Sequence, residues 1–350
     1  MRFQVSSLRE PIVLAPMAGG PSTPGLAAAV SNAGGLGFLA AGYLTPEQVG
    51  ADLAGLRRLT DRPFGVNLFV PSPASSAGSE LEAYAGRLAA EAQKQGWPLG
   101  KARWEDDGWQ RKRELMGERQ VPVVSFTFGC PDPRVIAALQ ATGSSVWVTV
   151  TNLEEAESTA GAGSDALVVQ GVEAGGHRGS HRDEDGSAEI GVLALLRLIG
   201  RRVDLPLIAA GGIADGRAIA AGLVAGATAA ALGTAFLLTP EAGTSAPHRA
   251  ALRQDGRTAL TRAFTGRLAR GIENRFQAEH LGAPSAYPEI HHLTAPLRAQ
   301  ARQQGDANLI NLWAGQAYPL ARELPAAELM AELSHGWRAA LREAASRFQP

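Results

Sequence analysis

The stretch LPLIAAGGIADGRAIAAGLVAGATAAALGTAF, residues 205–236, decides the fold because it contains a complete strand, helix and strand. The apolar runs 205–213 and 228–236 are typical of strands that are buried on both faces of a sheet. The alanine-rich text of 214–226 between them predicts a helix. Together they predict two parallel strands joined by a helix that covers the sheet.

The same alternation occurs along the preceding part of the chain. Further apolar runs, each bounded by glycine, proline or helix-capping residues, predict strands at 11–18, 36–43, 63–70, 121–129, 145–150 and 165–172. With the two strands of the opening stretch, these make eight strands separated by helical text. That pattern predicts an α/β fold, and the number eight favours a closed (β/α)8 TIM barrel over an open, doubly wound sheet.

Two segments fall outside the alternation. Residues 71–120 are too long for a simple loop and predict a helical insertion after the third strand. Residues 240–350 are rich in alanine, arginine and glutamine and predict a helical C-terminal extension, which we expect to form a subdomain or lid. The barrel itself is then expected to consist of residues 1–70 and 121–239.

The composition excludes several classes of function. The 350 residues are 45% hydrophobic and carry a formal net charge of −1, so they provide a large core and no basic surface for nucleic acid or for an acidic membrane. Cys130 is the only cysteine, which excludes a disulfide framework and a multi-thiolate metal site. Because the sequence has no signal-peptide core and no long apolar span, we expect a cytoplasmic protein.

The ends of the seventh and eighth strands predict a phosphate site. In a (β/α)8 barrel, the loops after these two strands commonly bind phosphate. Gly211 and Gly212 end the seventh strand, and Gly233 and Thr234 end the eighth, so backbone amides and one hydroxyl can face an anion. The lysine-containing GxxxxGK[ST] motif is absent, which favours a cofactor monophosphate over a nucleoside triphosphate.

Polar and thioether side chains at other strand ends suit a flat ring. Met17 follows the first strand, Asn67 lies within the third and Gln170 ends the sixth. An amide inside an apolar strand is costly unless it is paired, and each amide offers both a donor and an acceptor. The edge of a flavin would pair with such groups, although each amide taken alone fits a structural partner equally well.

The motifs in chain order resemble the nitronate monooxygenase family, whose members are also called 2-nitropropane dioxygenase-like. The resemblance rests on PIVLAPMAGG (11–20), FGVNLFVP (64–71), VVSFTFGCP (123–131), VQGVEAGGHRGS (169–180), PLIAAGGIADG (206–216) and AALGTAFLLTPEA (230–242). NLINLWAGQA (308–317) is similar to the C-terminal part of the family's class I branch. The resemblance implies an FMN-dependent TIM barrel that uses molecular oxygen to oxidise alkyl nitronates, propionate 3-nitronate among them, to a carbonyl compound and nitrite or nitrate.

The resemblance also implies roles for particular residues. His177 would be the active-site histidine, acting either as a base toward a carbon acid or as a cation toward a bound anion. Family members usually have a second histidine where this chain has Thr127, a hydroxyl in the substrate pocket that carries no charge. The residues expected around FMN are Ala15, Met17, Ala18, Asn67, Gln170, Gly175, Gly176, Gly211, Gly212, Gly233, Thr234, Ala235 and Phe236.

The other histidines suggest no further site. His291 and His292 lack neighbouring ligands at metal spacing, so no metal site is expected. His248, His280 and His335 lie in polar helical text and are expected to face solvent.

Two alternative functions stay open. The first is a flavin reductase that uses NAD(P)H to reduce quinones or enoyl thioesters, because flavin-dependent enoyl reductases share the EAGGH motif. The second is a flavin-binding protein without turnover, which Thr127 keeps under consideration. The expected partners are a small-molecule nitronate and O2, and a homodimer is left open as the assembly.

Overall fold

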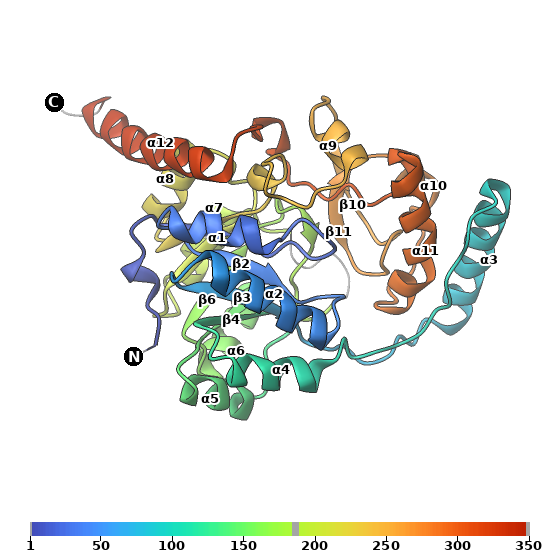
Figure 1. Ribbon diagram of the computed structural model, residues 1–350, viewed down its shortest axis with the longest axis horizontal. Coiled ribbons are helices and arrows are strands. Elements are labelled where there is room, and N and C mark those ends of the chain that lie inside the picture. Colours follow the sequence, from blue (N-terminus) through green and yellow to red (C-terminus); the bar gives the residue numbers. More distant parts are fainter. Residues whose placement is uncertain (1, 184–188, 348–350) are drawn as a thin grey trace.

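The computed structural model describes residues 2–183 and 189–347 and contains all eight predicted barrel strands (Figure 1). They run parallel in the order β1-β9-β8-β6-β5-β4-β3-β2. Their bounds are β1 Ile12–Leu14, β2 Gly37–Ala40, β3 Phe64–Phe69, β4 Val123–Thr127, β5 Ser145–Val150, β6 Ala166–Gln170, β8 Leu207–Ala210 and β9 Ala229–Leu232. The strands of the opening stretch are therefore β8 and β9.

Hydrogen bonds between β1 and the residue before β2 bring the two ends of the sheet together. The Leu14 amide donates to the Leu36 carbonyl at 2.9 Å, and the Leu36 amide donates to the Ile12 carbonyl at 3.0 Å. Val13 and Leu36 form a parallel bridge at the same place. The predicted (β/α)8 barrel is thereby confirmed.

The outer helices begin where the sequence supplies caps. The Thr45 hydroxyl accepts from the Gln48 amide while the Gln48 side chain accepts from the Thr45 amide, which makes a capping box at the start of α2. Asp215 accepts from the Ala218 amide at the start of α8. The helices around the barrel are α1 Pro24–Asn32, α2 Pro46–Leu59, α4 Trp109–Glu118, α5 Pro133–Ala141, α6 Leu153–Gly161, α7 Val192–Ile199 and α8 Gly216–Val224.

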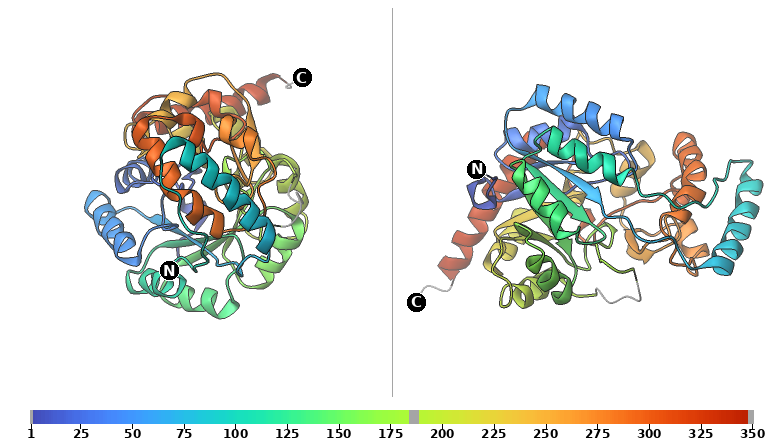
Figure 2. Two further views of the ribbon diagram at one scale, coloured as in Figure 1. Left: turned by 90° about the vertical axis from the view of Figure 1, so that its right-hand side faces the viewer. Right: turned by 90° about the horizontal axis from the view of Figure 1, so that it is seen from below.

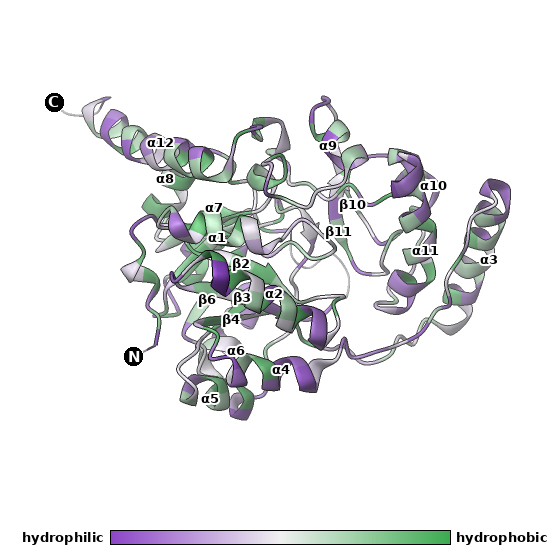
Figure 3. Cartoon of the chain, in the orientation of Figure 1, coloured by the Kyte–Doolittle hydropathy of each residue, from purple (hydrophilic) through white to green (hydrophobic). Residues whose placement is uncertain are grey.

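The interior of the barrel is filled with apolar side chains around Trp147. This indole is fully buried, and its ring lies 5.7 Å from Phe38 and 6.3 Å from Phe3, measured between centroids. Val13 and Ile208 belong to the same buried cluster. Apolar residues also line the strands and the inner faces of the helices in Figure 3. Because the interior is filled, space for a ligand lies at the end of the barrel and not through it.

The insertion and much of the C-terminal segment share a second core. Tyr84 and Leu88 of α3 (Gly78–Gln95) belong to one buried cluster with Phe276 of α10 (Arg275–Glu279) and Leu297 of α11 (Glu289–Gln304). The Tyr84 hydroxyl donates to the Ala263 carbonyl at 2.7 Å, which pins the insertion to the C-terminal segment. Figure 2 shows these helices together at one end of the molecule. We call α3 and the residues 252–314 that share its core the cap.

The prediction of a purely helical segment over 240–350 was wrong in part. The segment contains two antiparallel strands, β10 Thr258–Thr261 and β11 Ala269–Ile272, and β11 also pairs with β7, Gly176–His177. These strands are short and paired over a long sequence distance, so no local periodicity marks them. The remaining short elements are α9 Ala246–Leu252 and the 3-10 helices η1 Val5–Ser7, η2 Thr234–Phe236, η3 Ala307–Leu309 and η4 Tyr318–Leu320.

The last helix, α12 (Ala326–Arg347), returns to the barrel instead of joining the cap. It packs against α8 and α1, as Figure 1 shows. The contact with α8 is close because glycines meet there: a Cβ on Gly216 would lie 2.4 Å from the Gly336 carbonyl carbon. No helix among residues 2–183 and 189–347 is long and apolar enough to cross a membrane.

Close packing at the start of β2 makes Gly37 sensitive to substitution. A Cβ there would lie 1.9 Å from the Ala27 carbonyl oxygen, a backbone atom that no rotamer change can move. We expect Gly37→Ala to lower the free energy of unfolding by about 1–3 kcal/mol or more. Gly86→Ala in α3 is the matched control, because its Cβ meets nothing within 4 Å and should stabilise the helix by about 0.5–1 kcal/mol. Urea denaturation of both variants measures this, and equal effects would contradict it.

Candidate active site

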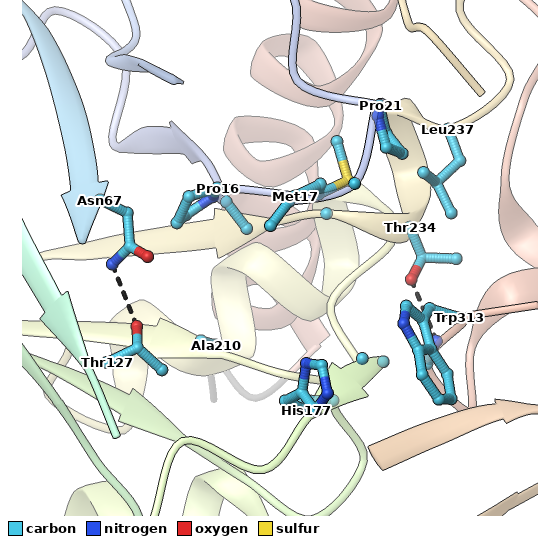
Figure 4. Close-up of a pocket in the computed structure, with 18 of the residues that line it drawn as sticks. Pro16, Met17, Pro21, Asn67, Thr127, His177, Ala210, Thr234, Leu237 and Trp313 are labelled. Atoms are coloured by element: carbon cyan, nitrogen blue, oxygen red, sulfur yellow. Dashed lines mark hydrogen bonds between the residues drawn. The ribbon is translucent and has the colours of Figure 1, made fainter. Parts of the chain in front are cut away.

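A cavity of about 460 Å³ lies at the C-terminal ends of the barrel strands, beneath the cap (Figure 4). Its floor includes the barrel side chains Phe38 and Trp147, and its walls come from both the barrel and the C-terminal segment. Most predicted site residues line it: Ala15, Met17, Ala18, Asn67, Thr127, Gln170, Gly175, Gly176, His177, Gly211, Gly212, Gly233 and Thr234. The fold therefore brings together residues that the sequence separates widely.

Ala235 and Phe236 do not line this cavity. Both side chains are fully buried in the hydrophobic core. The Phe236 amide donates to the Gly233 carbonyl at 2.9 Å within η2, so it is already used. These two residues support the loop after β9 instead of facing the space in front of it.

The loop after β8 has a backbone conformation that requires glycine. Gly211 and Gly212 have φ values of 106° and 68°, which only glycine adopts without strain. A Cβ on Gly211 would also lie 3.0 Å from the Ala174 amide nitrogen. Both glycines line the cavity, and the N-terminus of α8 that follows them is capped by the Asp215 carboxylate, which accepts from the Ala218 amide.

The amide of Asn67 has a defined orientation on β3. Its Nδ2 donates to the Ser125 hydroxyl at 2.9 Å and to the Thr127 hydroxyl at 3.0 Å. Both hydrogens of the amide are then used. Its carbonyl oxygen is the group that can accept a hydrogen bond from a ligand in the cavity.

Gln170 has a role that the sequence did not indicate. Its Nε2 donates to the His177 carbonyl at 3.1 Å, and its Oε1 accepts from the Gly179 amide at 2.8 Å and from Arg178 at 2.9 Å. The side chain thus ties the end of β6 to the segment that carries His177. Holding this segment occupies most of the hydrogen-bonding capacity of the Gln170 amide.

His177 is fixed in β7 by pairing of the backbone and by one side-chain hydrogen bond. Gly176–His177 pairs with Ala269–Arg270 of β11, and the ring Nε2 lies 2.9 Å from the Thr265 hydroxyl. That hydroxyl donates to the Arg267 carbonyl at 3.3 Å. With its proton used there, it accepts from Nε2–H, and this assignment leaves the Nδ1 lone pair as the basic group of the ring.

The surroundings of His177 favour a neutral imidazole. Burial is the main cause that lowers its pKa to about 3, and the cations Arg267 and Arg298 act in the same direction. Aromatic rings enclose it: the centroids of Phe128, Trp313 and Tyr287 lie 5.5, 5.6 and 5.8 Å from its own. Of the two roles open from the sequence, the geometry favours the base over the cation.

Four further polar residues line the cavity and had no clear signal in the sequence. They come from the C-terminal segment: His248, His291, Arg298 and Arg302. His248 and His280 were expected to face solvent, and this was wrong, because both are buried; His335 is exposed as expected. The Nε2 of His248 lies 3.1 Å from the Trp313 carbonyl. Helical polar text does not reveal which face a cap will cover.

Within the described ranges 2–183 and 189–347, no group of three His, Cys, Asp or Glu side chains is arranged to hold a metal ion. The polar groups of the cavity are amides, hydroxyls, imidazoles and guanidinium groups. This set suits an organic anion with a flat ring better than a divalent cation.

Comparison with known proteins agrees with this geometry. The profile of the family described as nitronate monooxygenase matches residues 3–336. The chain belongs to the nitronate monooxygenase family. Members of this family are flavin-dependent oxidoreductases, so the resemblance found in the motifs is confirmed and the protein is an enzyme of that class.

Two curated relatives and two solved structures show the extent of the similarity. Nitronate monooxygenase from Pseudomonas aeruginosa is 44% identical over 93% of this chain and 95% of its own length. The one from Paraburkholderia phytofirmans is 42% identical over 93% and 91%. The structure of nitroalkane oxidase from Streptomyces ansochromogenes is 51% identical, with a TM-score of 0.95 over 97% of this chain and 99% of that one. FabK from Thermotoga maritima is 28% identical, with a TM-score of 0.77 over 99% and 100%.

Burial of a neutral His177 predicts that acid destabilises the fold. Its pKa is about 3 in the folded protein and about 6.5 in the unfolded chain, so the unfolded state binds the proton first as the pH falls. The loss begins below about pH 6.5 and reaches about 2 kcal/mol at pH 5. We expect wild type to lose about 2 kcal/mol more than His177→Asn between about pH 7.5 and pH 5 in urea denaturation. Parallel pH profiles of the two proteins would contradict a buried neutral imidazole.

Proposed function

We propose that this enzyme uses FMN and molecular oxygen to oxidise alkyl nitronates, propionate 3-nitronate among them, to a carbonyl compound and nitrite or nitrate. The observation that carries the proposal is a single cavity that joins the loops after β8 and β9 to a half-buried histidine on β7, whose lowered pKa favours the neutral ring. The names of the relatives support the reaction, since they are nitronate monooxygenases and a nitroalkane oxidase.

The residues of the cavity fit FMN. Gly211, Gly212, Gly233 and Thr234 would hold the phosphate, because they line the cavity directly after β8 and β9, where glycine allows the backbone to approach an anion closely. Met17 and Ala15 would contact the ring: a Cβ on Gly233 would lie 3.5 Å from each of their side chains, so all three line one tight surface. The acceptor oxygen of Asn67 matches an N–H on the edge of a flavin. A bound flavin would supply the redox chemistry of the reaction.

The substrate side of the cavity suits an anion. Arg298 is buried and Arg302 is half-buried, and no salt bridge joins either guanidinium to a carboxylate among the described residues. Their charge favours a nitronate over its neutral parent. His177 would accept the α-carbon proton of a neutral nitroalkane at Nδ1, and the rings of Phe128, Tyr287 and Trp313 would exclude water.

The proposed phosphate site predicts that Gly211 is required for FMN. We expect Gly211→Ala to raise the dissociation constant of FMN at least tenfold, because the Cβ strains and crowds the loop. Gly163→Ala is the matched control, since its φ of 93° imposes a similar strain, its Cβ meets nothing within 4 Å, and it lies outside the cavity. Flavin fluorescence titration measures both. Equal losses of affinity would show that strain alone is responsible.

The role of His177 predicts a split between two substrate forms. We expect FMN-loaded wild type to consume O2 with preformed nitronates and, more slowly, with neutral nitroalkanes. His177→Asn should lower kcat/KM for the nitroalkane by about 100-fold or more, because it removes the base. It should lower kcat/KM for the nitronate much less, because a nitronate has no α-proton to lose.

Oxygen uptake with an oxygen electrode, using the nitroalkane and nitronate forms of one compound, tests this prediction. Absence of nitronate turnover by FMN-loaded wild type above the rate of free FMN would overturn the proposed function. Rapid anaerobic bleaching of the flavin by NADH or NADPH would instead support a reductase. A protein that binds FMN and is inert in both assays would be a flavin-binding protein without turnover.

A further inference from the structure

His291, which lies in the cap, lines the same cavity as His177 of β7. It lies in the first turn of α11, and its ring is stacked on that of Tyr43, with centroids 3.9 Å apart and an interplanar angle of 5°. The Tyr43 hydroxyl accepts from the Tyr287 hydroxyl at 3.3 Å, and the Tyr287 ring in turn contacts His177. The two histidines therefore belong to one aromatic wall.

The hydrogen bond from Arg298 defines which nitrogen of His291 carries the proton. Arg298 Nη2 lies 3.3 Å from His291 Nδ1 and 3.1 Å from the His291 carbonyl oxygen. A guanidinium group only donates hydrogen bonds, so Nδ1 must present its lone pair. The ring of a neutral His291 then carries its proton on Nε2. Arg298 itself donates to the Thr294 hydroxyl at 2.9 Å and to the side-chain oxygen of Asn311 at 3.0 Å.

No residue in the described ranges accepts a hydrogen bond from Nε2 of His291. This nitrogen is not fully buried, so a ligand in the cavity that the ring lines can reach it. We propose that His291 is a second functional histidine, whose Nε2–H donates a hydrogen bond to a nitro-group oxygen of the substrate. This inference rests on the proposed function, and it adds a specificity-determining group to it.

The hydroxyl at position 127 is poorly placed to do this work. Thr127 Oγ1 accepts from Asn67 Nδ2 at 3.0 Å and lies 3.4 Å from the Thr149 hydroxyl. Its own proton therefore has a neighbouring acceptor on β5. The Thr127 hydroxyl is therefore a poor hydrogen-bond donor toward a ligand, and Nε2–H of His291 supplies such a donor from the cap.

The insertion fixes the surface against which His291 stacks. Tyr43 has a φ of 68°, and its amide donates to the Asp107 carboxylate at 3.0 Å. Asp107 forms a buried ion pair with Lys112 at 2.7 Å, and Lys112 also donates to the Ala41 carbonyl at 2.9 Å. Asp107 and Lys112 are thus positioning residues for the wall that contains His291, and they give the insertion a part in the site.

Steady-state kinetics of three variants test the proposal. His291→Phe keeps the stacking on Tyr43 and removes the donor, whereas His291→Gln keeps an N–H at a similar distance from the backbone. A hydrogen bond to an anion is present before the nitronate loses its charge, so it contributes to binding more than to the chemical step. We expect His291→Phe to raise KM for the nitronate about tenfold or more, with kcat within about twofold of wild type. His291→Gln should recover most of this loss.

His292→Phe is the matched control, because His292 is next in sequence, lies outside the cavity and pairs with Glu105 at 3.1 Å. It should leave KM unchanged. An unchanged KM in His291→Phe, at wild-type flavin content, would overturn the proposal while leaving the proposed function intact. A fall in kcat alone would also overturn it, since it would indicate a structural effect.

Two measurements on the FMN-loaded protein do not depend on turnover. Nitrate has the same planar arrangement of nitrogen and oxygen, and we expect its dissociation constant, measured by the change in the flavin spectrum, to rise about tenfold in His291→Phe. ¹⁵N NMR of histidine-labelled protein should show His291 as the Nε2–H tautomer. Equal nitrate affinity in both proteins, or a proton on Nδ1, would overturn the proposal even if no nitronate were oxidised.

Discussion

The site depends on the pairing of Gly176–His177 with Ala269–Arg270, which joins the barrel to the cap. Residues 171–180, which follow β6, contain buried backbone carbonyls, and buried polar groups must be paired. Arginine side chains supply the donors: Arg178 donates to the Gln170 and Gly171 carbonyls, Arg270 to the Val172 carbonyl, and Arg267 to the Arg178 and Ser180 carbonyls. The position of His177 is therefore a product of the cap as much as of the barrel.

The cap is also the reason that the insertion and the C-terminal segment belong together. Tyr84 and Leu88 of α3 are fully buried in a cluster that they share with the C-terminal segment. After the cap, α12 packs on the barrel helix α8, where Gly216 and Gly336 are in close contact. A barrel alone would present the glycine loops to solvent, and the cap converts them into one wall of an enclosed site, where electrostatic interactions are stronger.

Local patterns in the sequence predicted the barrel well, because each strand is a short apolar run with its own boundaries. The glycine loops were predictable for the same reason, since Gly211 and Gly212 need no distant partner to adopt positive φ. The strand β7 and the placement of His291 were not, because each depends on a partner far along the chain, β11 and Tyr43 respectively. Gln170 bonds residues only seven to nine positions away, but these lie in a loop with no repeating pattern. Periodicity within a window carries no information about such contacts.

Two buried arginines, Arg267 and Arg298, place positive charge near His177. Arg267 and Arg298 are both buried, and no salt bridge joins either of them to a carboxylate within the described residues. Burial, with Arg302 nearby, lowers the pKa of Arg298 to about 9, which means that its surroundings in the protein disfavour its charge. An anion in the cavity would oppose this shift, so anion binding and the stability of the folded protein are coupled. Arg267 and Arg298 add to the burial that keeps His177 neutral, and their charge also favours a negatively charged ligand. Under the proposed function, the neutral base would take the α-proton of a nitroalkane and the cations would favour binding of the nitronate that results.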